Sequence, residues 1–199
     1  ASTAAQKAKV ESTISAQGIG TFYANAATTI PEGVKAYIAT EEPKMEGKDE
    51  QGNATGVLTM TQIEDGIIPA KTGVVLRGTA NEKYDFFYTA EDGTTETEGN
   101  MLRGYAGAAE FREVTLAKDY TTYVLAVEND KKGFYRKEAA FNVYNHKAYL
   151  NVPTSKGSAP ALTIRFEGDG STEIDNSQLT IENSAFIYDL MGRRILNPT

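Results

Sequence analysis

The chain has no cysteine and no tryptophan, and it has a single histidine, His146. The lack of cysteine excludes disulfide scaffolds, thiolate zinc sites, redox motifs and cysteine nucleophiles. A single histidine also excludes a metal centre built from several imidazoles. No run of about 18 consecutive apolar residues occurs, so no segment is expected to cross a membrane as a helix.

The charge balance is acidic rather than basic. Asp and Glu together number 27 and Lys and Arg together number 20, which gives a net charge of -7. An acidic chain lacks the excess of positive charge that attracts nucleic acid or an anionic membrane surface, so we expect no nucleic-acid partner. The 199 residues are enough for one sizeable core. The first residues carry no apolar signal core and are expected to be the start of a mature or truncated chain.

Short runs of aromatic and β-branched residues, interrupted by Gly, Pro, Asn and Asp, dominate the sequence. Many short strands with turn residues between them indicate a sandwich or barrel. In residues 34–39 the side chains of Val34, Ala36 and Ile38 alternate and are expected to face one way. The fold predicted is all-β, an antiparallel sandwich-like domain with many short strands. Further strands are predicted at residues 56–63, 73–77, 84–89, 123–127, 133–136, 147–152 and 161–167.

Composition also indicates which segments are not strands and where the domain ends. Thr3–Glu11 and Gly104–Phe111 are the only segments with helix-compatible composition, and Glu41–Thr55 is expected to be an exposed hairpin tip or loop. The acidic, glycine-rich stretch that follows Glu167 is typical of a linker. We therefore predict a β-sandwich-like domain at residues 1–167, a linker at 168–176 and a further strand-bearing segment at 177–199.

Several sequence blocks follow one another in a characteristic order: residues 21–24, 30–37, 67–78, 100–104, 123–125, 133–135 and 146–150. This ordered series resembles a β-rich domain found near the C-termini of secreted and cell-surface proteins of Bacteroidetes, which often carry leucine-rich repeats or other modules upstream. One departure is Val143–Asn145, where family members usually have a Pro-Ala pair before the His-Lys-Ala-Tyr block.

The tail carries a second, independent likeness. The block Ile187-Tyr188-Asp189-Leu190-Met191-Gly192-Arg193-Arg194-Ile195 is similar to the opening of the C-terminal sorting-type segment of such proteins, so residues 177–199 are expected to be part of one. The resemblance implies a location outside the cell or at the outer-membrane surface of a Gram-negative bacterium. It implies a sandwich-like fold and no known catalysis, and it supplies neither a ligand nor binding residues.

Candidate catalytic and metal-binding groups each have a simpler interpretation. His146 is the only group that titrates near neutral pH as a general base requires, but no Gly-x-Ser-x-Gly elbow accompanies it, so a structural or exposed histidine is favoured. Calcium is the most plausible ion, at Asp49–Asn53 or Asp169–Asp175, although neither segment fits the twelve-residue calcium loop. We expect no cofactor. The acidic residues lie mostly in turn-like segments and are expected to be solvated: Glu41, Glu42, Asp49, Glu50, Glu91, Asp92, Glu96 and Glu98.

The aromatic side chains are the strongest candidates for binding. Most are expected to fill the core, with Tyr84, Phe86 and Tyr88 on one face of a strand. Tyr105 and Tyr120 lie nearest to turns, so they are expected to be exposed and are the candidate ligand-binding residues.

Three functions remain open at this point. The first is a non-enzymatic adhesion or recognition module that contacts a host protein or glycan. The second is a passive spacer between an upstream module and the outer-membrane sorting end. The third, least favoured, is a small acid-based glycoside hydrolase, which needs two carboxyl groups across a cleft, one of them with a raised pKa. We predict that the protein is not an enzyme.

Overall fold

The computed structural model describes residues 7–156 and 159–168. Strands account for 51% of the structure and helix for 2%, so the predicted all-β class is confirmed. The short 3-10 helix η1 (Thr154–Lys156) directly follows the strand Lys147–Pro153. The predicted linker beyond Gly168 and the predicted tail at 177–199 lie outside the described residues.

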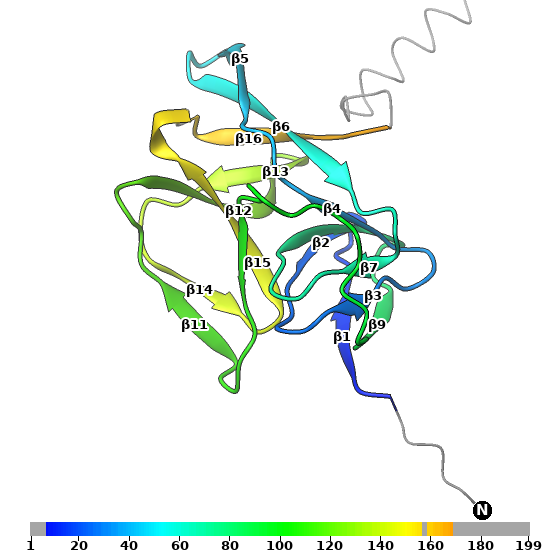
Figure 1. Ribbon diagram of the computed structural model, residues 1–199. Helices are drawn as coiled ribbons and strands as arrows, with labels where there is room; N and C mark the ends of the chain where they lie inside the picture. Colours follow the sequence, from blue (N-terminus) through cyan, green and yellow to red (C-terminus); the bar gives the residue numbers. More distant parts are fainter. Residues whose placement is uncertain (1–6, 157–158, 169–199) are drawn as a thin grey trace, which may run out of the picture. The chain divides into compact units, whose positions relative to one another are not determined.

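The largest element is a ten-stranded sheet (Figure 1). Its strands follow the order β10-β15-β12-β13-β16-β6-β4-β8-β2, and β5 pairs with β6 beside this path. The pairs are antiparallel except for β16 and β6, which run parallel. The strands are β2 (Ile19–Phe22), β4 (Lys35–Ile38), β5 (Lys44–Lys48), β6 (Ala54–Gln62), β8 (Val74–Arg77), β10 (Leu102–Tyr105), β12 (Tyr120–Glu128), β13 (Lys131–Arg136), β15 (Lys147–Pro153) and β16 (Ala161–Phe166).

The two ends of this sheet meet, so the sheet curls around an enclosed core. Just after β2, the backbone N–H of Tyr23 donates to the carbonyl oxygen of His146, next to β15, at 3.2 Å. The backbone N–H of Ala148 in β15 donates to Oγ1 of Thr21 at 3.0 Å. The approach is so close that a Cβ atom at Gly104 in β10 would lie 2.3 Å from Cγ of Tyr23. Only glycine leaves room for the ring here.

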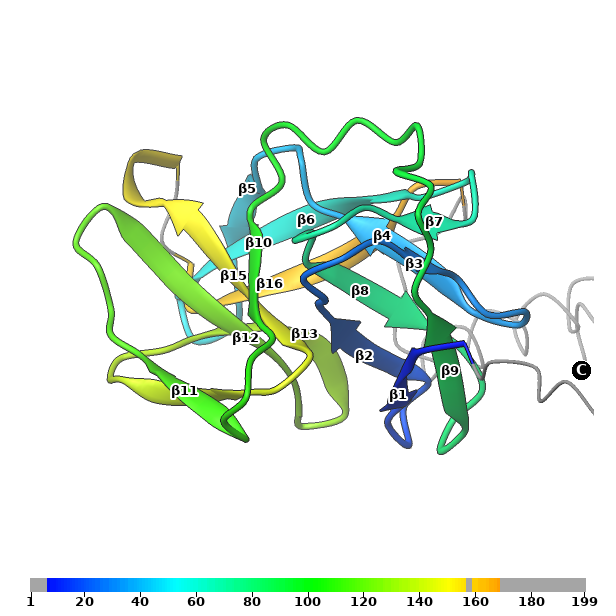
Figure 2. The same cartoon turned by 60° about the horizontal axis from the view of Figure 1, so that its bottom comes forward.

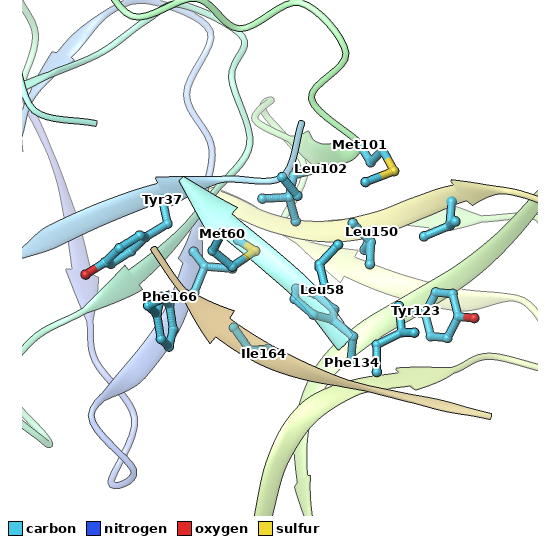
Figure 3. Close-up of a cluster of buried hydrophobic side chains, with 14 of the residues drawn as sticks. Tyr37, Leu58, Met60, Met101, Leu102, Tyr123, Phe134, Leu150, Ile164 and Phe166 are labelled. Atoms are coloured by element: carbon cyan, nitrogen blue, oxygen red, sulfur yellow. The ribbon is translucent and has the colours of Figure 1, made fainter. Parts of the chain in front are cut away.

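The larger core lies inside the curled sheet (Figure 3). The hydroxyl of Tyr123 donates to the carbonyl oxygen of Ala159 at 2.9 Å, so the one polar atom of this side chain is satisfied among apolar neighbours. Burial raises the pKa of Tyr123 to about 12. The large, fully buried side chains of this core include Tyr37, Leu58, Met60, Tyr123, Phe134 and Leu150.

A second core lies on the opposite face of β4 and β8. Val34, Ala36 and Ile38 belong to it, whereas Tyr37 between them belongs to the larger core. The predicted alternation of residues 34–38 is therefore confirmed. Because both faces of β4 are buried, every apolar side chain of this strand contributes to one core or the other.

Three two-stranded ribbons complete the domain. The β1–β9 ribbon covers the second core, where the rings of Phe22 and Phe86 stack with centroids 4.2 Å apart. Both views place the β1–β9 ribbon and β11 on opposite sides of the domain (Figure 1 and Figure 2). The ribbons are β1 (Lys9–Thr13) with β9 (Lys83–Phe87), β3 (Thr28–Thr29) with β7 (Ile67–Ile68), and β11 (Phe111–Val114) with β14 (Phe141–Tyr144).

Most of the predicted strands are present, with ends that differ by up to three residues. The segments predicted at 34–39, 56–63, 73–77, 84–89, 123–127, 133–136, 147–152 and 161–167 correspond to β4, β6, β8, β9, β12, β13, β15 and β16. Glu41–Thr55 is an exposed hairpin: β5 is exposed at every residue and pairs with the start of β6. Phe86 is fully buried and Tyr84 and Tyr88 pack on the same cluster, as predicted.

The two helix-compatible segments are not helical where they are described. Lys9–Thr13 is the strand β1, because pairing with β9 buries Val10 and Ser12. Within Gly104–Phe111, β10 ends at Tyr105 and β11 begins at Phe111. Pairing with β15 and β14 satisfies these backbones, and small residues between the two strands form the bend. Tertiary pairing therefore overrides local composition here.

Candidate functional site

The β11–β14 ribbon places two aromatic side chains on its solvent-facing side. Phe111 and Tyr144 lie directly opposite each other across the ribbon. Their ring centroids are 5.8 Å apart and their planes meet at 61°, an edge-to-face pair. Their exposed fractions, 45% and 53%, are the two highest of the large hydrophobic side chains in the described residues. Aromatic pairs of this kind are more often buried, so their exposure marks this face as a candidate site.

A polar pair lies next to the aromatic pair on the same face. Glu113 is two residues beyond Phe111 in β11, and Asn142 is two residues before Tyr144 in β14. Glu113 and Asn142 are also directly opposite each other, and both are exposed. Because side chains two apart in a strand share one face, the outer face carries a row of rings beside a row of hydrogen-bonding groups.

The inner face of the ribbon holds it firmly against the domain. Val114 and Val143 are buried in a small cluster with Tyr149 of β15. The ring of Phe141 meets that of Tyr149 edge to face, with centroids 5.6 Å apart and planes at 85°. These contacts fix which face of the ribbon points outward.

The end of the ribbon next to the aromatic pair is held by paired amides. The side chain of Asn145 accepts from the backbone N–H of Gly107 at 3.0 Å and donates to the carbonyl oxygen of the same residue at 3.1 Å. The backbone N–H of Asn145 donates to the carbonyl oxygen of Glu110 at 2.7 Å. The side chain of Asn25 donates to the carbonyl oxygen of Ala106 at 2.8 Å. Phe111 and Tyr144 are therefore attached to an ordered turn.

The β1–β9 ribbon provides an internal comparison, since it is also two-stranded and also packs one face on the domain. Its outer face carries two ion pairs, with the half-buried ring of Phe87 at one end. Nζ of Lys9 lies 2.8 Å from Oδ2 of Asp85, and Nζ of Lys83 lies 2.7 Å from Oε2 of Glu11. Solvated charges of this kind are the usual covering of an exposed ribbon. The β11–β14 ribbon differs in that two rings on its outer face are exposed.

The structure separates the two tyrosines predicted from sequence. Tyr105 is opposite Lys147 at the start of β15, and Tyr120 is opposite Pro153 at its end. Tyr120 is exposed, at 41%, as predicted. The expectation that Tyr105 is exposed is wrong: it is half-buried, because its ring packs on the cluster beneath the β11–β14 ribbon and is covered by the guanidinium group of Arg112, 5.2 Å from the ring centroid.

Sequence reasoning missed Phe111 and Tyr144 as exposed rings. Phe111 lies at the end of the helix-compatible segment Gly104–Phe111, and Tyr144 is one of the aromatic residues of which most are expected to fill the core. A usable signal was present in the alternation. Phe111 shares its period-two face with Glu113, and Tyr144 shares its face with Asn142, whereas the valines Val114 and Val143 occupy the opposite face.

His146 has a structural position in the turn between β14 and β15. It adopts a left-handed backbone conformation with φ of 60°. Its Nδ1 atom lies 2.9 Å from the carbonyl oxygen of Tyr23, and since that oxygen can only accept, Nδ1 carries the proton of this hydrogen bond. Its backbone N–H donates to the carbonyl oxygen of Tyr105 at 2.8 Å. His146 therefore links the two ends of the curled sheet.

The acidic side chains are placed as expected from their turn-like segments. All eight that were predicted to be solvated are exposed. Where carboxyl pKa values are shifted within residues 7–156 and 159–168, at Glu11, Asp49 and Asp65, the shift is downward. The hydrolase hypothesis requires a raised pKa instead.

The candidate calcium segment around Asp49 is a hydrogen-bonded turn. One carboxylate oxygen of Asp49 accepts from the backbone N–H groups of Gln51 and Asn53, at 3.0 and 2.8 Å. The other accepts from the side-chain amide of Asn53 at 3.1 Å. These oxygens face N–H donors, as in an Asx turn. No group of three or more metal-ligating side chains occurs in the part of the chain that the structure describes. The other candidate segment begins at Asp169 and lies outside that part.

Over residues 7–156 and 159–168 the structure thus defines an all-β domain with one exposed aromatic ribbon. Among the described residues, no helix has the length and apolar character needed to cross a membrane. Comparisons with protein-family models, with curated proteins and with solved structures find no match to this chain. The resemblance to C-terminal domains of Bacteroidetes surface proteins therefore stays a prediction.

Proposed function

We propose that this domain is a non-enzymatic recognition module of a secreted or cell-surface protein, and that it binds a host protein or glycan through the outer face of the β11–β14 ribbon. The observation that carries the proposal is the exposed pair Phe111 and Tyr144 on a ribbon whose other face is packed. Aromatic side chains supply much contact area at low entropic cost, and they dominate binding surfaces. The sequence resemblance supports a setting at the outer surface of a Gram-negative cell.

The rigidity of the ribbon supports recognition over a passive spacer. A spacer needs only a solvated surface, such as the charged outer face of the β1–β9 ribbon. A binding surface gains affinity when its side chains are already held in place, because less freedom is lost when the partner binds. The paired amides of Asn145 and Gly107 hold the aromatic end of the β11–β14 ribbon in this way.

A binding screen tests the proposal. The intact chain is tested at physiological salt against host-matrix proteins and glycans, with and without calcium. A reproducible partner should lose binding in the double variant Phe111→Ala/Tyr144→Ala and keep it in Tyr120→Ala, which removes an exposed ring from a different strand. Circular dichroism checks that each variant is folded. A folded protein that binds nothing on the panel would favour the spacer, and unchanged binding in the double variant would move the site elsewhere.

A further inference from the structure

The outer face of the β11–β14 ribbon combines an apolar surface with hydrogen-bonding groups at short range. Phe111 and Tyr144 form the apolar row, and Glu113 and Asn142 form the polar row. The two rows are two residues apart along the strands, about 7 Å. The carboxylate of Glu113 accepts hydrogen bonds, and the amide of Asn142 both donates and accepts. A ligand that fits must therefore be apolar on one side and rich in hydroxyl groups at its edge.

The size of the face favours a small ligand unit over a protein partner. A large aromatic side chain has roughly 200 Å² of surface, so two rings that are about half exposed offer roughly 200 Å² together. A stable protein–protein interface needs about 800 Å² from each partner. The two strands of the ribbon have four residues each and present four side chains on this face. That area matches one or two sugar rings.

From this geometry we infer that the ribbon binds neutral carbohydrate; the inference rests on the proposed recognition function and assigns its ligand class. The C–H face of a pyranose ring packs on the aromatic pair, and its hydroxyl groups reach Glu113 and Asn142. The carboxylate of Glu113 and the net charge of -7 oppose sialylated and sulfated glycans. Because a face of this size binds weakly, several copies of the domain or of the sugar increase the overall affinity.

The test uses saturation-transfer NMR and chemical-shift titration with the intact chain. The neutral probes are the hexasaccharides of β-1,4-glucose, α-1,4-glucose and N-acetylglucosamine, each up to 10 mM, and the charged probes are sialyllactose and heparin oligosaccharides. At least one neutral probe should bind, and the charged probes should bind at least about tenfold more weakly, a difference of roughly 1.4 kcal/mol.

Four variants separate the roles of the two rows. Phe111→Ala/Tyr144→Ala should weaken neutral-sugar binding at least about tenfold, and Asn142→Ala about fivefold, as expected for the loss of a ring contact and of a hydrogen bond. Tyr120→Ala and Lys83→Ala, on other surfaces, should leave binding unchanged. Because Phe111, Tyr144 and Asn142 are exposed, none of these changes removes a buried contact, and the NMR spectrum of each variant reports its fold.

The outcomes distinguish this inference from the proposed function. If no neutral probe binds the folded chain, or if binding survives Phe111→Ala/Tyr144→Ala, the carbohydrate inference is wrong. If the charged glycans bind best, it is also wrong. If a purified host protein binds the chain but not the same double variant, and no neutral probe binds, the recognition function is supported and the carbohydrate inference is wrong. Absence of both kinds of binding would overturn both proposals.

Discussion

The side-chain oxygen of Asn100 accepts a hydrogen bond from the backbone N–H of Ala39 at 3.0 Å, across 61 residues of sequence. The amide nitrogen of the same side chain donates to the carbonyl oxygen of Gly73 at 2.9 Å. The backbone N–H of Met101 then donates to the carbonyl oxygen of Ala39 at 2.8 Å. Asn100 is buried. One side chain thus connects the residues that flank β4 and β8 with the start of β10.

Replacing Asn100 with alanine should destabilise the domain strongly. Asn100→Ala leaves the buried N–H of Ala39 and the carbonyl oxygen of Gly73 without these partners, and each unsatisfied buried group costs about 1–3 kcal/mol. We expect the free energy of unfolding to fall by roughly 2–4 kcal/mol. Urea denaturation of both proteins at pH 7 measures the difference. A loss below about 0.5 kcal/mol, the usual range of surface substitutions, would contradict this role.

The variant Asn100→Asp tests the donor separately, because the introduced carboxylate keeps an acceptor for Ala39 but has no N–H for Gly73. Burial beside a carbonyl oxygen should raise the pKa of the introduced carboxyl group above about 3.9, the usual value. A carboxyl group whose pKa is higher in the folded than in the unfolded state lowers the free energy of unfolding at pH values above its unfolded pKa, and it has no such effect below that pKa. The stability deficit relative to wild type should therefore be smallest below about pH 4 and grow as the pH rises. A deficit independent of pH would argue against the donor role.

The sequence predicts strands well where apolar alternation is strong, as in residues 34–39, and poorly where pairing alone makes the strand. β5 consists of exposed residues with lysine at both ends, so it has no buried face to reveal it. β10 ends and β11 begins on either side of residues 106–110, which are mostly small and whose composition favours a helix. The parallel pairing of β6 with β16 joins segments about a hundred residues apart, and no local pattern encodes such a pairing.

The candidate site illustrates the same limit. Proximity to turns correctly predicts the exposure of Tyr120, but it fails for Tyr105, because the cover over that ring comes from Arg112 on another strand. Phe111 and Tyr144 become visible as a pair only when the register of β11 and β14 is known. Sequence alternation places each ring beside a polar residue, but it does not place the two rings together.

Gly104 is predicted to tolerate no side chain. A Cβ atom there would lie 2.3 Å from Cγ and 2.4 Å from Cβ of Tyr23, close to the backbone of that residue, so the sheet ends must move apart. Overpacking of this kind costs about 1–3 kcal/mol, and we expect Gly104→Ala to lower the free energy of unfolding by that amount. Gly20→Ala is the matched control in β2, where a Cβ atom would have its nearest neighbours at 3.9 Å. Equal stability losses in the two variants would show that the close approach is not the cause.

Asp65 is predicted to hold the segment that follows β9. Its carboxylate accepts from the backbone N–H groups of Ile67, Thr94 and Thr95 and from the hydroxyl of Thr94. Partial burial alone would raise the pKa of Asp65, but these hydrogen bonds outweigh it and lower the pKa below its usual value near 3.8. The stabilisation is therefore complete above about pH 4 and is lost as the pH falls through the lowered pKa.

Hydrogen exchange checks the role of Asp65. Asp65→Ala should increase exchange at the amides of Thr94 and Thr95 about fivefold at pH 7, which corresponds to about 1 kcal/mol of local stability. The amide of Asn53, whose acceptor is Asp49 in a separate turn, should exchange as in wild type. If Thr94 and Thr95 are equally protected in both proteins, the segment is held by other contacts.

Lys147 is predicted to reduce stability at neutral pH. Its amine is partly buried between β15 and β1, with Nζ 3.4 Å from Oγ of Ser12, and this desolvation lowers the pKa of Lys147 below its usual value of 10.5. Between the lowered pKa and 10.5 the unfolded chain binds a proton that the folded chain does not, so stability rises with pH in that window. Lys147→Met keeps the apolar stem of the side chain and removes the charged amine, and it should stabilise the domain at pH 7 because no charge then has to be desolvated on folding.

The pH dependence of the difference between the two proteins isolates this effect. Tyr123, with a pKa of about 12 in the folded state and 10 when unfolded, makes wild type lose stability as the pH rises above 10. That loss is common to both proteins and cancels in the difference. The advantage of Lys147→Met, measured by urea denaturation at intervals from pH 7 to 11, should therefore shrink toward the alkaline end, where the lysine in wild type is neutral in both states. An advantage that stays constant over this range would mean that improved packing of the methionine, and not removal of a desolvated charge, is responsible.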